Sequence, residues 1–120
     1  MAEVELTSSA FQHLSLALVV DDPDAPSGTF THWLAWGIDP TAGGLGEREA
    51  APGEGLNDFG QVGWRGPCPP PGHGPHRYFF RLHGLEGELD LPVGAGRAEV
   101  ERALEGRALA VAELVGTYEL

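Results

Sequence analysis

Lysine is absent from this sequence, and its seven cationic side chains are all arginine. Against them stand 18 acidic residues, which give a formal net charge of −11 at pH 7. A field of this sign repels nucleic acid and anionic membrane surfaces, so we expect neither to bind over a broad patch. A small anion would still bind where hydrogen-bond donors gather locally.

Cysteine is nearly absent too, because Cys68 is the only one in the chain. A single cysteine excludes an internal disulfide. The N-terminus has no charged segment followed by an apolar one, and no apolar run is long enough to cross a bilayer. These absences predict a cytoplasmic protein with no integral membrane association.

Motifs for metal binding and for nucleophilic catalysis are also lacking. His73, His76 and His83 do not have the spacing of a zinc motif. Cys68 stands between two prolines, far from any predicted helix start, and is best interpreted as a small packed thiol. No serine has the flanking glycines of a hydrolase nucleophile elbow. We therefore expect neither a metal ion nor another cofactor.

Glycine and proline are abundant, at 18 and 10 of the 120 residues, yet apolar residues still make up 42%. The apolar residues arrive in strand-like runs, which predicts a turn-rich β domain rather than a disordered chain. Strands are expected over residues 14–21, 31–38, 76–83 and 108–118, and one short helix over residues 98–105. Because one helix is too few for a parallel sheet, we predict an all-β, mainly antiparallel fold.

Two aspartates, Asp22 and Asp24, follow the first predicted strand in the sequence DDPDAP. Each proline of this stretch biases its predecessor away from helix, so the strand end is held extended and then turned. One interpretation is a fixed pair of acceptors that orients a histidine or binds an amine or hydroxyl of a ligand. The alternative is a turn in which both carboxylates bind local backbone amides.

His32 lies near the start of the second predicted strand, beside Trp33. A single histidine next to a tryptophan is commonly an ordinary core residue. Adjacent antiparallel strands would nevertheless bring His32 close to the two aspartates. We therefore include it among the candidate site residues.

The stretch GPCPPPGHGPHRYFF, residues 66–80, has five prolines in its first ten residues. Proline restricts both its own φ and the preceding residue, so the loop is stiffened before it reaches the next strand. On that strand His76 and Tyr78 share a face and would converge on one bound group, while the loop glycines would let a ligand approach the backbone amides. Alternatively, Tyr78 is a core aromatic and His76 lies at a rim.

Five motifs occur in a fixed order: LALVVDDPDAPSG, HW, NDFG, GPCPP and GPHRYFF. Together they resemble the phosphatidylethanolamine-binding protein (PEBP) family, in particular its small bacterial and archaeal members, the Raf-kinase-inhibitor-like proteins. The resemblance implies a Greek-key β fold of two antiparallel sheets and a pocket for a phosphate or a phosphorylated head group. Its pocket residues carry over to Asp22, Asp24, His32, Gly66, Cys68, His76 and Tyr78. Amides near Cys68, together with His76 and Tyr78, would donate to the anion, and Asp22 would orient a histidine.

The chain also departs from the family pattern. Family members usually carry about thirty residues, ending in Pro-Leu-x-Trp, before the strand that begins here near Leu14. We therefore expect residues 1–120 to form a single PEBP-like domain with a shortened N-terminal segment. An incomplete sheet edge would then be open to pairing in a homodimer. Arg107 also replaces a histidine that related bacterial chains often have.

The leading hypothesis is a binding protein for a small anionic or phosphorylated ligand, with a regulatory role through an unidentified protein partner as an extension. The runner-up is a hydrolase of a phosphate or acyl ester that uses the Asp and His cluster as general acid and base. A third hypothesis is a structural interaction module whose stability no small ligand would change.

Overall fold

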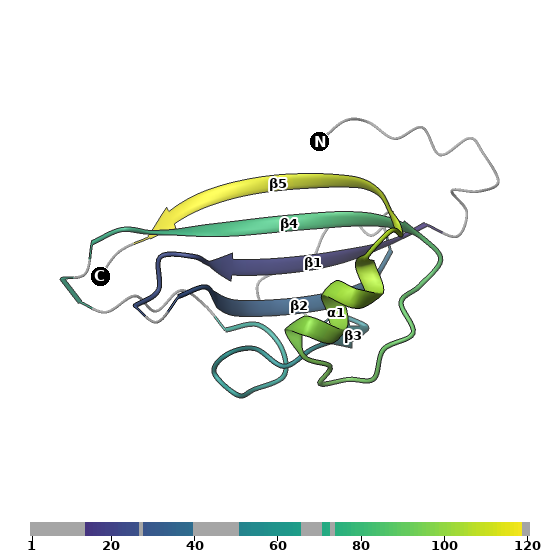
Figure 1. Ribbon diagram of the computed structural model, residues 1–120, viewed down its shortest axis with the longest axis horizontal. Helices are drawn as coiled ribbons and strands as arrows, with labels where there is room; N and C mark the ends of the chain where they lie inside the picture. Colours follow the sequence, from purple (N-terminus) through teal and green to yellow (C-terminus); the bar gives the residue numbers. More distant parts are fainter. Residues whose placement is uncertain (1–13, 27, 40–50, 66–70, 73, 119–120) are drawn as a thin grey trace.

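The computed structural model describes residues 14–26, 28–39, 51–65, 71–72 and 74–118. Its elements are β1 (Leu14–Asp22), β2 (Phe30–Ile38), β3 (Gly53–Glu54), β4 (His76–Glu86), α1 (Arg97–Leu104) and β5 (Ala108–Tyr118) (Figure 1). The strands form one sheet in the order β3–β2–β1–β4–β5, and every neighbouring pair is antiparallel. The predicted antiparallel architecture with a single short helix is therefore confirmed.

Two details differ from the sequence prediction. The long connection after β2 contains the two-residue strand β3, which is too short to leave any alternation in the sequence. In addition, the described strands make one sheet, whereas the family resemblance implied two. One isolated bridge, between Leu56 and Val62, is the only pairing outside that sheet within the described ranges.

The sheet buries apolar side chains on both faces, because β1 and β2 lie inside it. We call the side covered by α1 the helix face and the other side the open face (Figure 1). On the helix face the buried cluster consists of Ala17, Val19, Leu34, Trp36, Leu85, Leu89, Ala95, Val100 and Leu104. On the open face it consists of Val20, Trp33, Ala35, Ile38 and Ala51. Alternating residues of β1 thus supply both clusters, as period-two geometry requires.

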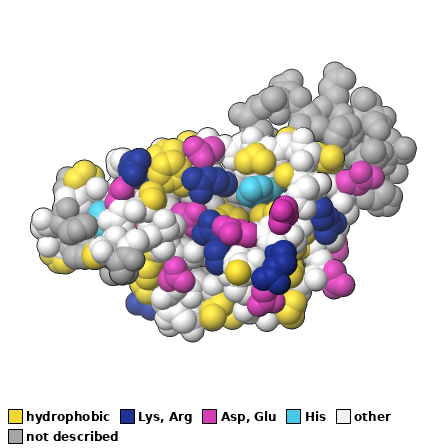
Figure 2. All heavy atoms as spheres, in the orientation of Figure 1, with side chains coloured by type: hydrophobic (Ala, Val, Ile, Leu, Met, Phe, Trp, Pro, Cys, Tyr) yellow, Lys and Arg dark blue, Asp and Glu magenta, His cyan; other side chains and the backbone are white. Residues whose placement is uncertain are grey.

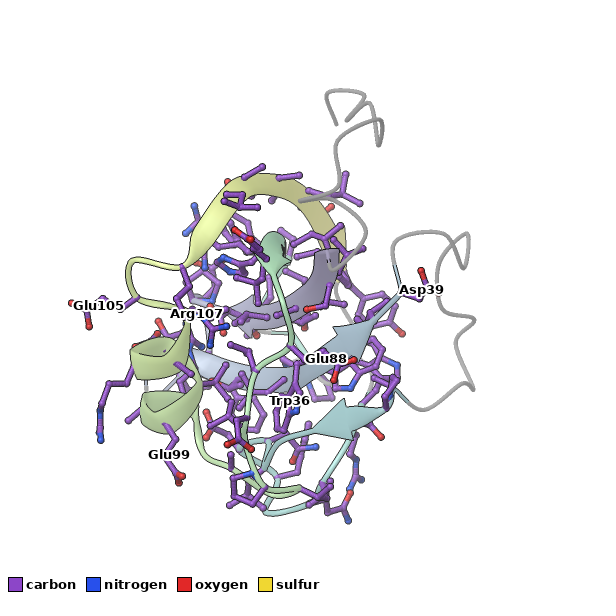
Figure 3. All side chains as sticks on the ribbon, turned by 90° about the vertical axis from the view of Figure 1, so that its right-hand side faces the viewer. Trp36, Asp39, Glu88, Glu99, Glu105 and Arg107 are labelled. Carbon is purple, nitrogen blue, oxygen red and sulfur yellow. The ribbon has the colours of Figure 1, made fainter. Side chains whose placement is uncertain are left out.

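The helix α1 packs onto the sheet through Val100 and Leu104, its two buried residues. Its start is stabilised because the Glu99 carboxylate accepts a hydrogen bond from the backbone N–H of Gly96, at 3.4 Å. Just past its end, Gly106 has φ +72°, a conformation that glycine adopts readily. Helix α1 is therefore held by one apolar stripe, while Glu99 points to solvent (Figure 3).

Trp36 lies in the helix-face cluster beneath the connection that leads from β4 to α1 (Figure 3). Its indole lies across Gly53, where an added Cβ would be only 2.0 Å from the ring nitrogen. Glycine at this position is therefore required by close packing rather than by its backbone angles. Arg107, the departure noted above, donates from Nη2 to the carbonyl oxygen of Glu88, at 3.4 Å.

Among the described strands, β5 lies at one edge of the sheet and pairs with β4 alone. Several of its large apolar side chains are exposed, namely Leu109, Val111, Leu114, Val115 and Tyr118. Edge strands with this character commonly pair with another chain. The homodimer expected from the sequence is consistent with such an edge and stays a prediction, as does the single-domain organisation.

Candidate functional site

Asp22 and His76 form a buried pair where β1 ends and β4 begins. Asp22 Oδ2 lies 2.6 Å from His76 Nδ1, and the two side chains are only 5% and 2% exposed. The other carboxylate oxygen, Oδ1, accepts a hydrogen bond from the backbone N–H of Asp24, at 2.8 Å. Asp22 therefore fixes the orientation of the imidazole and the shape of the following turn at once. Both sequence interpretations of this aspartate apply together.

Asp24 makes the matching contact with the next residue of β4, Arg77. Its Oδ2 accepts hydrogen bonds from the backbone N–H and the Nε–H of Arg77, both at 2.9 Å, and its Oδ1 accepts one from Nη2 at 2.8 Å. These hydrogen bonds hold the pKa of Asp24 well below its ordinary value of 3.8. The turn after β1 is thus tied to β4 by one buried pair and one exposed pair.

A β-bulge in β2 determines where His32 points. Val20 is opposite Trp33, whereas the next residue, Asp21, is opposite Thr31, so His32 is the extra residue. As a result His32 and Trp33 both reach the ring of Trp64, at centroid distances of 6.2 and 5.6 Å. The bulge places two successive side chains on the open face, as bulges characteristically do.

His32 is consequently part of an aromatic cluster rather than a partner of the aspartates. It is 3% exposed, and its Nδ1 lies 3.0 Å from the carbonyl oxygen of Arg65. Its ring contacts those of Phe30, Phe59 and Tyr78 at centroid distances of 5.0, 5.5 and 5.3 Å. His32 therefore lies at the same end of the sheet as Asp22, whose strand partner is Phe30, but among the described residues its hydrogen bond goes to a backbone carbonyl and not to a carboxylate.

The loop over residues 57–65 completes this end of the open face. Buried Asn57 holds it, accepting hydrogen bonds from the backbone N–H of Phe59 and Gln61 and donating to the carbonyl of Gly63 at 2.8 Å. The guanidinium carbon of Arg65 lies 4.7 Å from the centre of the Phe59 ring. Nothing in the NDFG motif of this loop indicated that Phe59 and Arg65 would reach the aromatic cluster.

Tyr78 connects the aromatic cluster to the Asp22–His76 pair, because it follows His76 on the same face of β4. It is 4% exposed, and its ring contacts His32. A hollow of about 430 Å³ opens at this end of the sheet, lined by Asp24, Pro75, His76, Arg77 and Thr117. Its volume suits a small ligand. The structure therefore brings five of the predicted residues to one end of the sheet, whereas Gly66 and Cys68 lie outside the described residues.

Metal binding finds no support among the residues that the structure describes, where no three His, Cys, Asp or Glu side chains gather as ligands. Over the same residues, no helix has the length and apolar character needed to cross a membrane. The cytoplasmic location expected from the sequence stays a prediction.

The Asp24–Arg77 pair predicts a pH dependence of stability. Because the folded pKa of Asp24 is depressed, the pair stabilises the fold above the unfolded pKa and ceases to do so as the pH falls through the folded pKa. Replacing Asp24 with asparagine should therefore flatten the loss of stability between about pH 5 and about pH 3, measured by urea denaturation. Asp90→Asn, at an exposed carboxylate with no described partner, is the control and should retain the wild-type slope. Equal slopes in all three proteins would contradict the prediction.

Comparison with known proteins points to one family. A family model described as phosphatidylethanolamine-binding protein matches residues 3–119. A UPF0098 protein of Pyrococcus horikoshii is 49% identical over 114 residues, covering 88% of this chain and 57% of the relative. A second relative, from Mycobacterium tuberculosis, carries the lipoprotein name LppC. It is 44% identical over 106 residues, and the match covers 87% of this chain and 53% of LppC. The chain therefore spans little more than half the length of these two relatives.

Solved structures agree with the sequence matches. A protein of Chlamydia trachomatis, described as a PEBP homolog, superposes with a TM-score of 0.83 at 34% identity, covering 94% of this chain and 77% of that one. Escherichia coli YbcL, described as a member of the mammalian PEBP family, gives a TM-score of 0.69 at 34% identity. The superposition covers 88% of this chain and 71% of YbcL. Such membership supports ligand binding as the general role. With the family model matched from residue 3 to residue 119 and the fold shared with two solved members, this chain belongs to the phosphatidylethanolamine-binding protein family.

Proposed function

We propose that the chain binds a small anionic or phosphorylated ligand, such as a phospholipid head group, at the end of the sheet where β1 meets β4. The observation that carries this proposal is the buried Asp22–His76 pair beside the hollow of about 430 Å³. An imidazole held at Nδ1 by a carboxylate keeps one ring orientation, which makes it a preorganised partner for a bound anion.

Local charge also favours an anion at this place despite the net charge of the chain. Arg77 compensates the charge of Asp24 through two guanidinium hydrogen bonds. Arg65 adds a guanidinium at the adjacent aromatic cluster. The predicted contributions of Gly66 and Cys68, through loop amides, belong to the same proposal. The acidic remainder of the surface would restrict the site to small ligands.

The test is a calorimetric titration of the full chain with inorganic phosphate and, separately, with phosphoethanolamine. We expect saturable binding that His76→Gln weakens at least about tenfold, because the substitution removes the imidazole that Asp22 holds in one orientation beside the hollow. The matched control is His83→Gln, since His83 lines the helix face and should leave this binding unchanged. Absence of heat with either ligand, or equal loss in both variants, would refute the proposal.

The same pair supports a second candidate function, hydrolysis of a phosphate or acyl ester. A carboxylate that orients an imidazole is the arrangement of a general base. If this function holds, the wild-type protein should hydrolyse at least one ester in a panel of phosphate and acyl esters. The His76→Gln variant should not hydrolyse that ester. Turnover that survives this substitution would remove His76 from the reaction, and binding without turnover would favour the leading proposal.

A further inference from the structure

A second hollow, of about 730 Å³, lies on the helix face between α1 and the strands β4 and β5. It is on the opposite side of the sheet from Tyr78 and the aromatic cluster, because Arg81 and His83 alternate with Tyr78 along β4. Figure 2 shows this face, where arginine and acidic side chains surround a histidine side chain and hydrophobic atoms. The volume lies within the range of small-molecule sites.

The floor of this hollow is apolar. Val19 and Leu104, which are 3% and 8% exposed, belong to the helix-face cluster and line the hollow from below. Val111 lines it from β5 and is 57% exposed, so a ligand resting there would remove its side chain from water. A hydrocarbon chain that covers Val111 would gain the usual stabilisation of apolar burial.

Arginines form the polar wall, anchored from beneath by buried Asp21. Arg97 donates to both Asp21 oxygens, and Arg81 donates from Nη1 to Asp21 Oδ2 at 3.0 Å. The outer Nε–H groups of these arginines donate to Glu101 and Glu113. The two guanidinium groups are thus fixed in place before any ligand arrives.

Three polar groups at this wall have hydrogen-bonding capacity that the described residues do not use. Among the described residues, no hydrogen-bond partner is found for Arg81 Nη2, for the guanidinium of Arg102, or for the ring of His83. Burial lowers the pKa of His83, and the charges of Arg81 and Arg97 lower it further. The positive field of the two arginines therefore reaches the ring, where a bound anion would oppose it.

The charged groups around the hollow limit how much negative charge it accepts. Arginines 81, 97 and 102 face the carboxylates of Asp21, Glu101, Glu105 and Glu113. These are three positive charges against four negative ones, so an added negative charge is favoured only where it meets the donors of His83 and Arg102 directly. A second charge on the same ligand would meet the carboxylates at the rim.

We propose that the helix-face hollow is a second ligand site, which takes a small amphipathic monoanion with one carboxylate and a short hydrocarbon chain. The carboxylate contacts His83, Arg81 and Arg102, and the chain covers Val19, Leu104 and Val111. This site is separate from the phosphate site proposed above, because the two hollows lie on opposite faces of the sheet and share no lining residue.

The experiment is a titration of the full chain with octanoate, followed by heteronuclear NMR, with acetate and 1-octanol as separate arms. Octanoate should give saturable shifts in β4, β5 and α1, and both acetate and 1-octanol should bind at least about tenfold more weakly, because each lacks one half of the recognition. Val111→Asp, at an exposed position, should abolish octanoate binding. His76→Gln should bind octanoate as the wild type does.

The pH dependence isolates the head-group contact. Octanoate affinity should rise severalfold as the pH falls, because the bound carboxylate favours a proton on His83, and His83→Gln should flatten that rise. Equal affinity for octanoate and 1-octanol, an unchanged pH profile in His83→Gln, or shifts confined to the surroundings of His76 would each overturn the proposal.

Discussion

Replacing Asp22 with alanine is expected to lower the free energy of unfolding by about 2 kcal/mol, because it removes the buried carboxylate that is hydrogen-bonded to the His76 ring. The side chains of Asp22 and His76 are 5% and 2% exposed, so water cannot replace the lost partner of the imidazole. The substitution also removes the acceptor for the backbone N–H of Asp24. Urea denaturation of the purified variant measures the effect.

Asp24→Ala is the matched control for this prediction. Asp24 lies two residues along the same turn and is paired with the neighbouring residue of β4, but Arg77 is 55% exposed and water can replace the lost contact. We expect only a small change in stability. Equal destabilisation by the two variants would show that the turn, rather than burial of the Asp22–His76 pair, determines the cost. Asp22→Asn should be intermediate, since an amide oxygen still accepts a hydrogen bond but carries no charge.

Leu34→Ala is expected to destabilise the fold by about 3 kcal/mol, since it opens a cavity at the centre of the sheet. Leu34 is fully buried in the helix-face cluster, where β2 lies between two neighbouring strands. Its backbone carbonyl also accepts a hydrogen bond from the N–H of Gly55 at 2.9 Å, so the residue joins the loop to the sheet. Collapse around the cavity is hindered because neighbours are held from both sides.

Leu114→Ala provides the control for the cavity argument. Leu114 is 68% exposed on the edge strand β5, so the same truncation should change stability by less than about 0.5 kcal/mol in the isolated chain. Thermal unfolding at several protein concentrations would detect any role of β5 in pairing, because a dimer interface makes the midpoint depend on concentration. A cost for Leu114→Ala comparable to that of Leu34→Ala would contradict the placement of the core.

Much of this architecture is encoded locally. The alternation of β1, β4 and β5 and the apolar stripe of α1 are properties of consecutive residues, so their bounds follow the sequence to within three residues. The ordered set of motifs also indicated the family, which the comparisons confirm. Whether the predicted site residues bind a ligand stays a prediction.

Other features depended on tertiary structure, because they arise from contacts between distant segments. No local pattern announces the bulge that brings His32 onto the open face beside Trp33, since a bulge is defined by the partner strand. Strand β3 exists only through its pairing with β2. The contact between Asp21 and Arg97 joins residues 76 positions apart.

The sequence by itself therefore determined the strands, the helix and the residue types available for binding. Only the tertiary structure decided that Asp21 and Asp22, adjacent in the chain, serve opposite faces of the sheet. Asp22 pairs with His76 at the strand end, whereas Asp21 anchors the arginines beneath α1. The physical reason is that strand geometry sends successive side chains to opposite sides, while register and packing, which are long-range, choose the partners on each side.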